Sequence, residues 1–258
     1  MKNIIRRLFG RFYTVQFSNT LLYKGTWEKG VFHGYGELTY KKGSRFLGQF
    51  QKGNRHGMGK YTSSSGYIYD GEWLFGRPTG KCKITYKNGD EYEGFSLNGL
   101  RHGKGKLYEN ESQRTYHGYW QNDKIFGDIV IEANEWLFKG KMPDRCGKTS
   151  GELFYKNGTS YSGHLENFKR SGPGLYVGKF GEKIKGNWIN ELDVKQAKKV
   201  DRDGIYWEGN LENFQPHGFM NVRLPSGYKY DGVFDSGNLL RVLSVNNQSK
   251  APSAYRVH

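Results

Sequence analysis

The chain has 258 residues, with 37 glycines, 16% aromatic residues and a formal net charge of +15 from 40 basic and 25 acidic residues. The many aromatics argue against a disordered chain, no apolar stretch approaches the roughly 18 residues of a membrane-spanning helix, and two cysteines cannot build a disulfide framework. This composition indicates β-structure with frequent turns, and the scarcity of cysteine suits a reducing, cytoplasmic setting.

Residues 1–22 are expected to form a basic N-terminal segment and a capping strand. Twelve basic but only two acidic residues fall within residues 1–60, which suggests an anionic partner at this end. Apolar residues within 1–12 recur at helical spacing among basic side chains, as in a short helix at a membrane surface. The candidates for binding an acidic phospholipid or an acidic tubulin tail are Lys2, Arg6, Arg7 and Arg11. A mitochondrial presequence and a solvated capping tail are the alternatives.

A 23-residue period dominates the sequence from residue 23 to about residue 237. Each of ten units starts with an aromatic or apolar residue, and a glycine follows two positions later in every unit. The starts are Tyr23, Phe46, Tyr69, Tyr92, Tyr116, Phe138, Tyr161, Ile184, Trp207 and Tyr230. Two positions after that glycine most units carry a large apolar residue, and Ser96 is the exception. Such a period predicts a repeat array.

The second half of a unit carries its own pattern. His-Gly-x-Gly occurs at residues 33–36, 56–59 and 102–105, and a glycine-containing turn closes most units. Because apolar residues alternate with a period of two in each half, each unit is expected to fold as strand, turn, strand and turn. The predicted fold is therefore all-β: an elongated, single-layer, twisted antiparallel sheet of tandem hairpins, with short capping segments at both ends.

The spacing Tyr-x-Gly-x-Trp-x-x-Gly followed by His-Gly-x-Gly, as in Tyr23 to Gly36, resembles the MORN (membrane occupation and recognition nexus) repeat. The resemblance extends over about nine to ten units, residues 23–237. The unit starting at Ile184 lacks His-Gly-x-Gly and is expected to have a distorted second strand or a special contact. The resemblance implies a non-enzymatic scaffold at a cytoskeletal, ciliary, flagellar or membrane-associated assembly.

One face of the predicted sheet gathers the aromatic residues. A single layer has no second sheet to cover such a face, and a large exposed apolar surface usually marks an interaction site. We expect it to bind a helical or extended segment of a partner protein, or a second copy of the chain. The candidate partner-binding residues are Tyr23, Trp27, Phe46, Phe50, Tyr69, Trp73, Tyr92 and Ser96. Ser96 is expected to leave a notch, so that Ser96→Trp would block binding without disturbing the fold.

Neither a cofactor nor a metal is expected, and no catalysis. Gly34-x-Gly36 does not open a helix, as a phosphate-binding loop would. The repeated histidines, such as His33 and His56, would lie about 10 Å apart on alternate strands, too far to share a zinc ion bound at about 2 Å. No nucleophile–base pair stands out, and the residues after Gly237 are too few for a catalytic domain.

Residues 238–258 are expected to form a C-terminal cap, as a strand or short helix, and a flexible tail. The alternative function is binding of anionic ligands, such as phosphoinositide membranes or nucleic acid, through the basic N-terminal end. Aromatics interleaved with basic residues can stack bases. Nucleic acid is nevertheless disfavoured, because the basic excess lies at one end of the chain rather than along the sheet.

Overall fold

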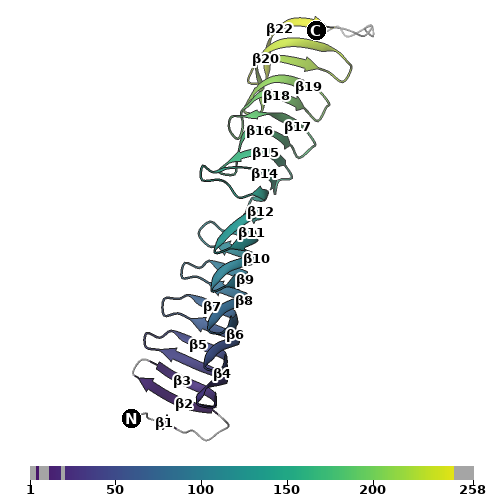
Figure 1. The fold of residues 1–258 in the computed structure, drawn as a ribbon. Helices are drawn as coiled ribbons and strands as arrows, with labels where there is room; N and C mark the ends of the chain where they lie inside the picture. The colour runs from purple at the N-terminus through teal and green to yellow at the C-terminus, as the bar shows by residue number, and fades with distance from the viewer. Residues whose placement is uncertain (1–3, 6–11, 19–20, 247–258) are drawn as a thin grey trace. The chain divides into compact units, whose positions relative to one another are not determined.

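The computed structural model describes residues 4–5, 12–18 and 21–246, and these residues form β-strands joined by turns (Figure 1). The chain divides into two compact units, residues 1–134 and 135–258. The boundary falls inside the predicted array. It lies beside the two repeats that start at Tyr116 and Phe138, in which Asp123 and Arg145 replace the last glycine of the Tyr-x-Gly-x-Trp-x-x-Gly pattern. An all-β fold of tandem antiparallel hairpins is confirmed in both units.

The first unit pairs its strands antiparallel in chain order. Its strands are β1 (Ile4–Ile5), β2 (Phe12–Ser18), β3 (Leu21–Glu28), β4 (Val31–Tyr40), β5 (Arg45–Gln51), β6 (Asn54–Thr62), β7 (Ile68–Leu74), β8 (Arg77–Thr85), β9 (Glu91–Leu97), β10 (Leu100–Glu109), β11 (Arg114–Gln121) and β12 (Lys124–Glu132).

The second unit repeats this arrangement. Its strands are β13 (Trp136–Lys141), β14 (Lys148–Tyr155), β15 (Ser160–Glu166), β16 (Lys169–Val177), β17 (Lys183–Trp188), β18 (Val194–Val200), β19 (Tyr206–Glu212), β20 (Gln215–Arg223), β21 (Lys229–Asp235) and β22 (Asn238–Asn246). Strand β22 pairs with β21, so the C-terminal cap is a strand and not a helix.

A row of glycines crosses the first sheet from strand to strand. Gly25 pairs with Gly36, Gly36 with Gly48, and the row continues to Gly118 with Cys82 as its interruption. The ring of Tyr23 lies over this row: a Cβ atom on Gly25 or Gly36 would come within 2.5 Å of the tyrosine oxygen. Aromatic rings therefore pack directly on the glycine backbone.

The first glycine of His-Gly-x-Gly makes a β-bulge. Gly34 and Gly57 have φ angles of +66° and +68°, which glycine adopts without steric cost. The pairing register shifts beside each of them. Because a bulge bends a strand and increases its twist, the end of each hairpin curls over the sheet. In the first hairpin this brings Phe32 into a stack with Tyr23, with 4.0 Å between ring centroids.

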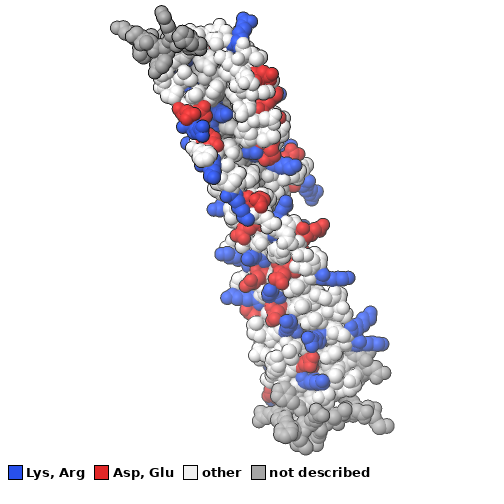
Figure 2. Space-filling model, turned by 180° about the vertical axis from the view of Figure 1, so that it is seen from behind, with Lys and Arg blue, Asp and Glu red and all other residues white. Residues whose placement is uncertain are grey.

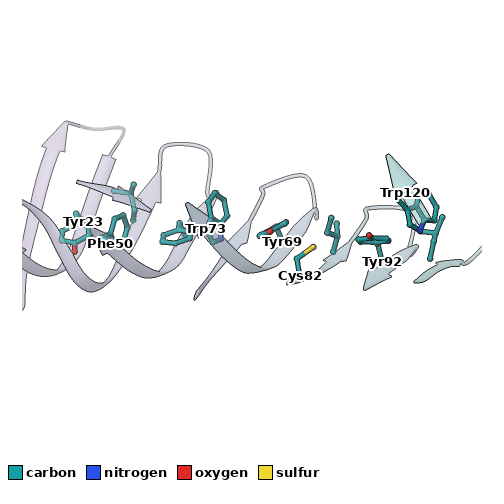
Figure 3. Close-up of a cluster of buried hydrophobic side chains, with 11 residues drawn as sticks. Tyr23, Phe50, Tyr69, Trp73, Cys82, Tyr92 and Trp120 are labelled. Atoms are coloured by element: carbon teal, nitrogen blue, oxygen red, sulfur yellow. The ribbon is translucent and has the colours of Figure 1, made fainter. Parts of the chain in front are cut away.

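This curling corrects the expectation of an uncovered aromatic face. Tyr23, Phe46, Tyr69 and Tyr92 are completely buried, and Figure 3 shows Tyr23, Tyr69 and Tyr92 in a row along the sheet. Rings of neighbouring hairpins meet edge to face, as Phe46 and Trp73 do at 5.0 Å, a geometry that adds about 0.5–1.5 kcal/mol beyond area burial. The single sheet thus builds its own core from hairpin to hairpin.

Two irregular segments differ from the regular units. Within the N-terminal segment, where a helix is expected, Ile4 and Ile5 instead pair with Val15 and Thr14 of β2. In the unit starting at Ile184, the predicted special contact is the side chain of Val194: a Cβ atom on Gly186 would lie 2.5 Å from its methyl group.

Candidate functional site

The structure places the predicted partner-binding residues in the core. Their exposed fractions are at most 4%, except for half-buried Trp27. Tyr23, Tyr69 and Tyr92 each donate a hydrogen bond from the phenol to the backbone carbonyl three residues later, at 2.8–3.0 Å. Burial raises the pKa of Tyr23 to about 12 and also raises the pKa of Tyr69. These side chains hold the fold together and offer little surface to a partner.

Ser96 is not a notch. Its side chain is 4% exposed, and its hydroxyl lies 2.8 Å from the phenol oxygen of Tyr69. Burial raises the pKa of the Cys82 thiol, which interacts with the same two side chains. The predicted notch is therefore wrong, and Ser96→Trp would force an indole into this filled space.

The predicted anionic-partner residues Lys2, Arg6, Arg7 and Arg11 lie outside the described residues. Their role stays a prediction. Elsewhere in the described chain the charges are mixed, and Figure 2 shows basic and acidic side chains interspersed over one face.

The opposite face of the first sheet carries an open groove of about 760 Å³. Its floor is the glycine row, at Gly71, Gly94, Gly105 and Gly118. Strands β6 to β11 supply its walls. The positions of this row point to the core face, where a Cβ atom on Gly94 or Gly105 would strike the Tyr92 ring, so only backbone faces the groove. The lining side chains are Met58, Asp70, Lys81, Lys83, Glu93, Phe95, Lys104, Lys106 and His117, and Cys82 contributes backbone to the floor.

Exposed apolar side chains lie along one wall of the groove. Met58 is 55% exposed and Phe95 43% exposed, and Tyr119 on the adjoining strand β11 is 56% exposed. The register places Lys81 directly opposite Phe95 and Lys104 directly opposite Tyr119. Each lysine is therefore beside an aromatic ring.

Lysines outnumber acidic side chains in the groove. Asp70 pairs with Lys60 at 3.8 Å, and Lys83 pairs with Glu91 at 3.0 Å. In the described part of the chain Lys81, Lys104 and Lys106 form no ion pair, and among the groove's acids neither does Glu93. The groove keeps a positive excess and can accept a negatively charged ligand.

Sequence reasoning missed this groove because it followed the aromatic row. The groove residues sit between the core positions of each unit, where residue types vary from unit to unit. A signal was present: Lys81 and Lys104, like Lys83 and Lys106, are 23 residues apart, so like charges recur on alternate strands. Their side chains lie on the face away from the core because strand residues alternate.

The repeated histidines have structural contacts. The His33 Nδ1 lies 3.1 Å from a carboxylate oxygen of Glu28, and the His56 ring packs against Phe75 with 5.5 Å between centroids. Within the described residues, no group of three or more potential metal ligands is close enough to hold an ion. These contacts give His33 and His56 a place in the packing of the hairpins.

The family model of the MORN repeat matches residues 23–45, 46–66, 69–91 and 92–112. No curated protein matches the sequence. The TCP10 domain of Danio rerio CPAP, solved with a peptide of Danio rerio STIL, is 11% identical over 95% of this chain and 99% of that chain, with a TM-score of 0.30. The TCP domain of Drosophila melanogaster SAS-4, solved with a proline-rich motif of Ana2, is 14% identical over 82% of this chain and 84% of that chain, with a TM-score of 0.21. Across the described residues, no helix has the length and apolar character needed to cross a membrane.

Proposed function

We propose that this chain, which carries MORN repeats within residues 23–112, is a non-enzymatic scaffold that holds a segment of a partner protein in the groove on the face opposite its aromatic core. The observation that carries the proposal is the groove itself, which combines a floor of bare backbone with the exposed apolar side chains of Met58 and Phe95. Exposed aromatic anchors commonly dominate protein binding.

The resemblance to MORN proteins supports a place in a cytoskeletal, ciliary, flagellar or membrane-associated assembly. A scaffold of this kind needs a surface that varies between units while the core stays regular. This chain has that division: the core positions repeat as aromatics, whereas the groove positions carry methionine, lysine, glutamate and phenylalanine.

Position-specific photo-cross-linking tests the proposal. A benzophenone amino acid replaces Tyr119 beside the groove in the full chain, and the control replaces Phe180, a turn residue of the second unit that is 71% exposed. In extracts of cells that express the protein, we expect a discrete protein adduct from position 119 and none from position 180. The adduct should disappear when Phe95→Ser is added.

Equal adducts from both positions, or an adduct at 119 that persists with Phe95→Ser, would overturn the groove as the binding surface. An adduct of twice the chain mass would identify a second copy as the partner.

A further inference from the structure

We propose that the groove of the first unit takes an extended, acidic segment of a partner protein, which runs across the strands and presents an acidic residue at every third position. This inference rests on the proposed function and specifies the chemistry of the segment. Charge, neighbouring rings and repeat spacing each support one part of it.

The charge of the groove selects an acidic ligand. Lys81 and Lys104 are exposed and without an ion pair in the described chain, as is Lys106. Of the two acidic side chains that line the groove, Asp70 pairs with Lys60, and Glu93 forms no ion pair within the described chain. Carboxylates of a bound segment would complete ion pairs that the chain itself leaves open.

The neighbouring rings select a segment with apolar residues between its acids. Phe95 lies opposite Lys81, and Tyr119 lies opposite Lys104, so apolar and basic contacts alternate along the groove. Gln49 and Glu72 accept hydrogen bonds from the bulge amides of Met58 and Lys81. In the next repeat Phe95 occupies the position of Gln49 and Glu72, so it presents a ring to the groove in place of a hydrogen-bond acceptor.

The repeat spacing selects the conformation of the segment. Lys81 and Lys104 lie on strands β8 and β10, and two strand spacings amount to about 9.6 Å. Three residues of a polyproline II segment span about 9.3 Å. A β-strand repeats its side chains every 6.6 Å or so, and two helical turns span roughly 10.8 Å. The polyproline II segment matches the lysine period best.

The acidic side chains of the groove disfavour a nucleic acid. In the pairing register Glu93 lies between Lys83 and Lys106, and Asp70 lies between Lys60 and Lys83. A nucleic-acid strand carries a negative charge at every nucleotide and would meet these carboxylates, whereas a peptide can place uncharged residues beside them. We therefore assign the groove to a protein segment.

Fluorescence anisotropy tests the assignment with the full chain and a labelled peptide of about twelve residues, in which Glu occupies every third position and Pro and Phe fill the rest. The comparison probe has the same composition with its Glu residues gathered at one end. We expect the periodic peptide to bind at least about tenfold more tightly, because only it can pair with both lysines.

The variant Lys81→Glu/Lys104→Glu should weaken binding of the periodic peptide by about tenfold or more. The matched control is Lys42→Glu/Lys87→Glu, which changes the charge equally at two exposed turn positions and should bind like the original chain. Both variants should keep the circular dichroism spectrum of the original, because all four side chains are exposed.

Equal affinity for the two peptides would overturn the three-residue period. Tighter binding of an oligouridylate than of either peptide would reassign the groove to nucleic acid. If neither peptide binds while the cross-link at position 119 forms, the partner segment is not acidic, and the scaffold function stands without this inference.

Discussion

Cys82 and Ser96 compensate each other's departures from the repeat. In regular hairpins a tryptophan of the next unit packs on the glycine row, and its indole donates to a glycine carbonyl, as Trp73 does to Gly59 at 2.9 Å. Cys82 replaces such a glycine, and Ser96 replaces the tryptophan that would lie over it. Both side chains are buried. Cys82 is larger than the glycine that it replaces, and Ser96 is smaller than the tryptophan that it replaces, so the two changes in volume offset each other.

Ser96→Trp should therefore destabilise the fold on its own, and Cys82→Gly should restore it. Overpacking a filled core site commonly costs about 1–3 kcal/mol, and Cys82→Gly removes the side chain that the indole would strike. Urea unfolding of the two single variants and the double variant measures the coupling. A double variant as unstable as the sum of its single changes would refute the compensation.

Arg101→Ala should lower the stability of the first unit by about 2 kcal/mol. The guanidinium lies 4.3 Å from the Trp120 ring centroid, and its nitrogens donate to the side chain and carbonyl of Asp123 at 3.1 and 2.9 Å. Arg101→Lys keeps the charge but not the planar fork, so it should recover less than half of the loss.

Arg77→Ala is the matched control for Arg101, because this exposed side chain makes a long contact of 3.5 Å with Asn98. It should change the thermal midpoint by less than a third of the change caused by Arg101→Ala. Equal shifts would show that the stacked guanidinium contributes nothing special.

Alkaline pH should destabilise the protein through its buried tyrosines. Burial raises the pKa of Tyr23 to about 12 and raises the pKa of Tyr92, whereas an unfolded tyrosine ionises near pH 10. The folded state thus retains protons that the unfolded chain releases, and stability present below about pH 10 falls as the pH rises toward 12. Thermal midpoints measured from pH 8 to about pH 11 report this loss.

Tyr92→Phe should reduce that alkaline loss, at the cost of the phenol's hydrogen bond to the Phe95 carbonyl at neutral pH. Phe46 and Phe138 occupy the same repeat position without a hydroxyl, so the fold accepts the change. An unchanged pH profile for Tyr92→Phe would assign the alkaline effect to other groups.

Arg6→Glu/Arg7→Glu/Arg11→Glu should abolish binding to acidic liposomes, if the N-terminal segment anchors an anionic surface. Each basic residue contributes about 1 kcal/mol near such a surface, so reversing three charges is a large change. Sedimentation with vesicles of phosphatidylserine and phosphatidylcholine measures the binding, and Lys42→Glu/Lys87→Glu serves as the control. Binding that survives the triple reversal would leave the segment a simple cap.

The hairpin array was predictable because its signals are local. The 23-residue period, the two-residue alternation and the turn glycines locate the strands from β3 to β21. The rings over Gly25 and Gly36 follow from the same spacing. In each repeat a glycine stands between two large residues of the core face, so it leaves room for an aromatic ring to lie over the backbone.

The burial of the aromatic face was not predictable from spacing alone. It depends on the positive φ of Gly34 and its equivalents, which turns a flat hairpin into a curled one and covers the rings. The compensation between Cys82 and Ser96 could not be predicted from single repeats either, because the two residues belong to successive repeats. The groove was missed for a related reason. The aromatic face was expected to be the open one, and the opposite face became the candidate only once the aromatic face was found to be buried.

The compensation between Cys82 and Ser96 determines which modules of the array can be excised. Removing residues 46–68 would bring Trp73 over Gly36, a combination equivalent to Trp73 over Gly59. Removing residues 69–91 would bring Ser96 over Gly59 and leave a void the size of an indole. The repeat at residues 46–68 can therefore be deleted without damage to the core, whereas the repeat at residues 69–91 cannot. Both deletions preserve the 23-residue period.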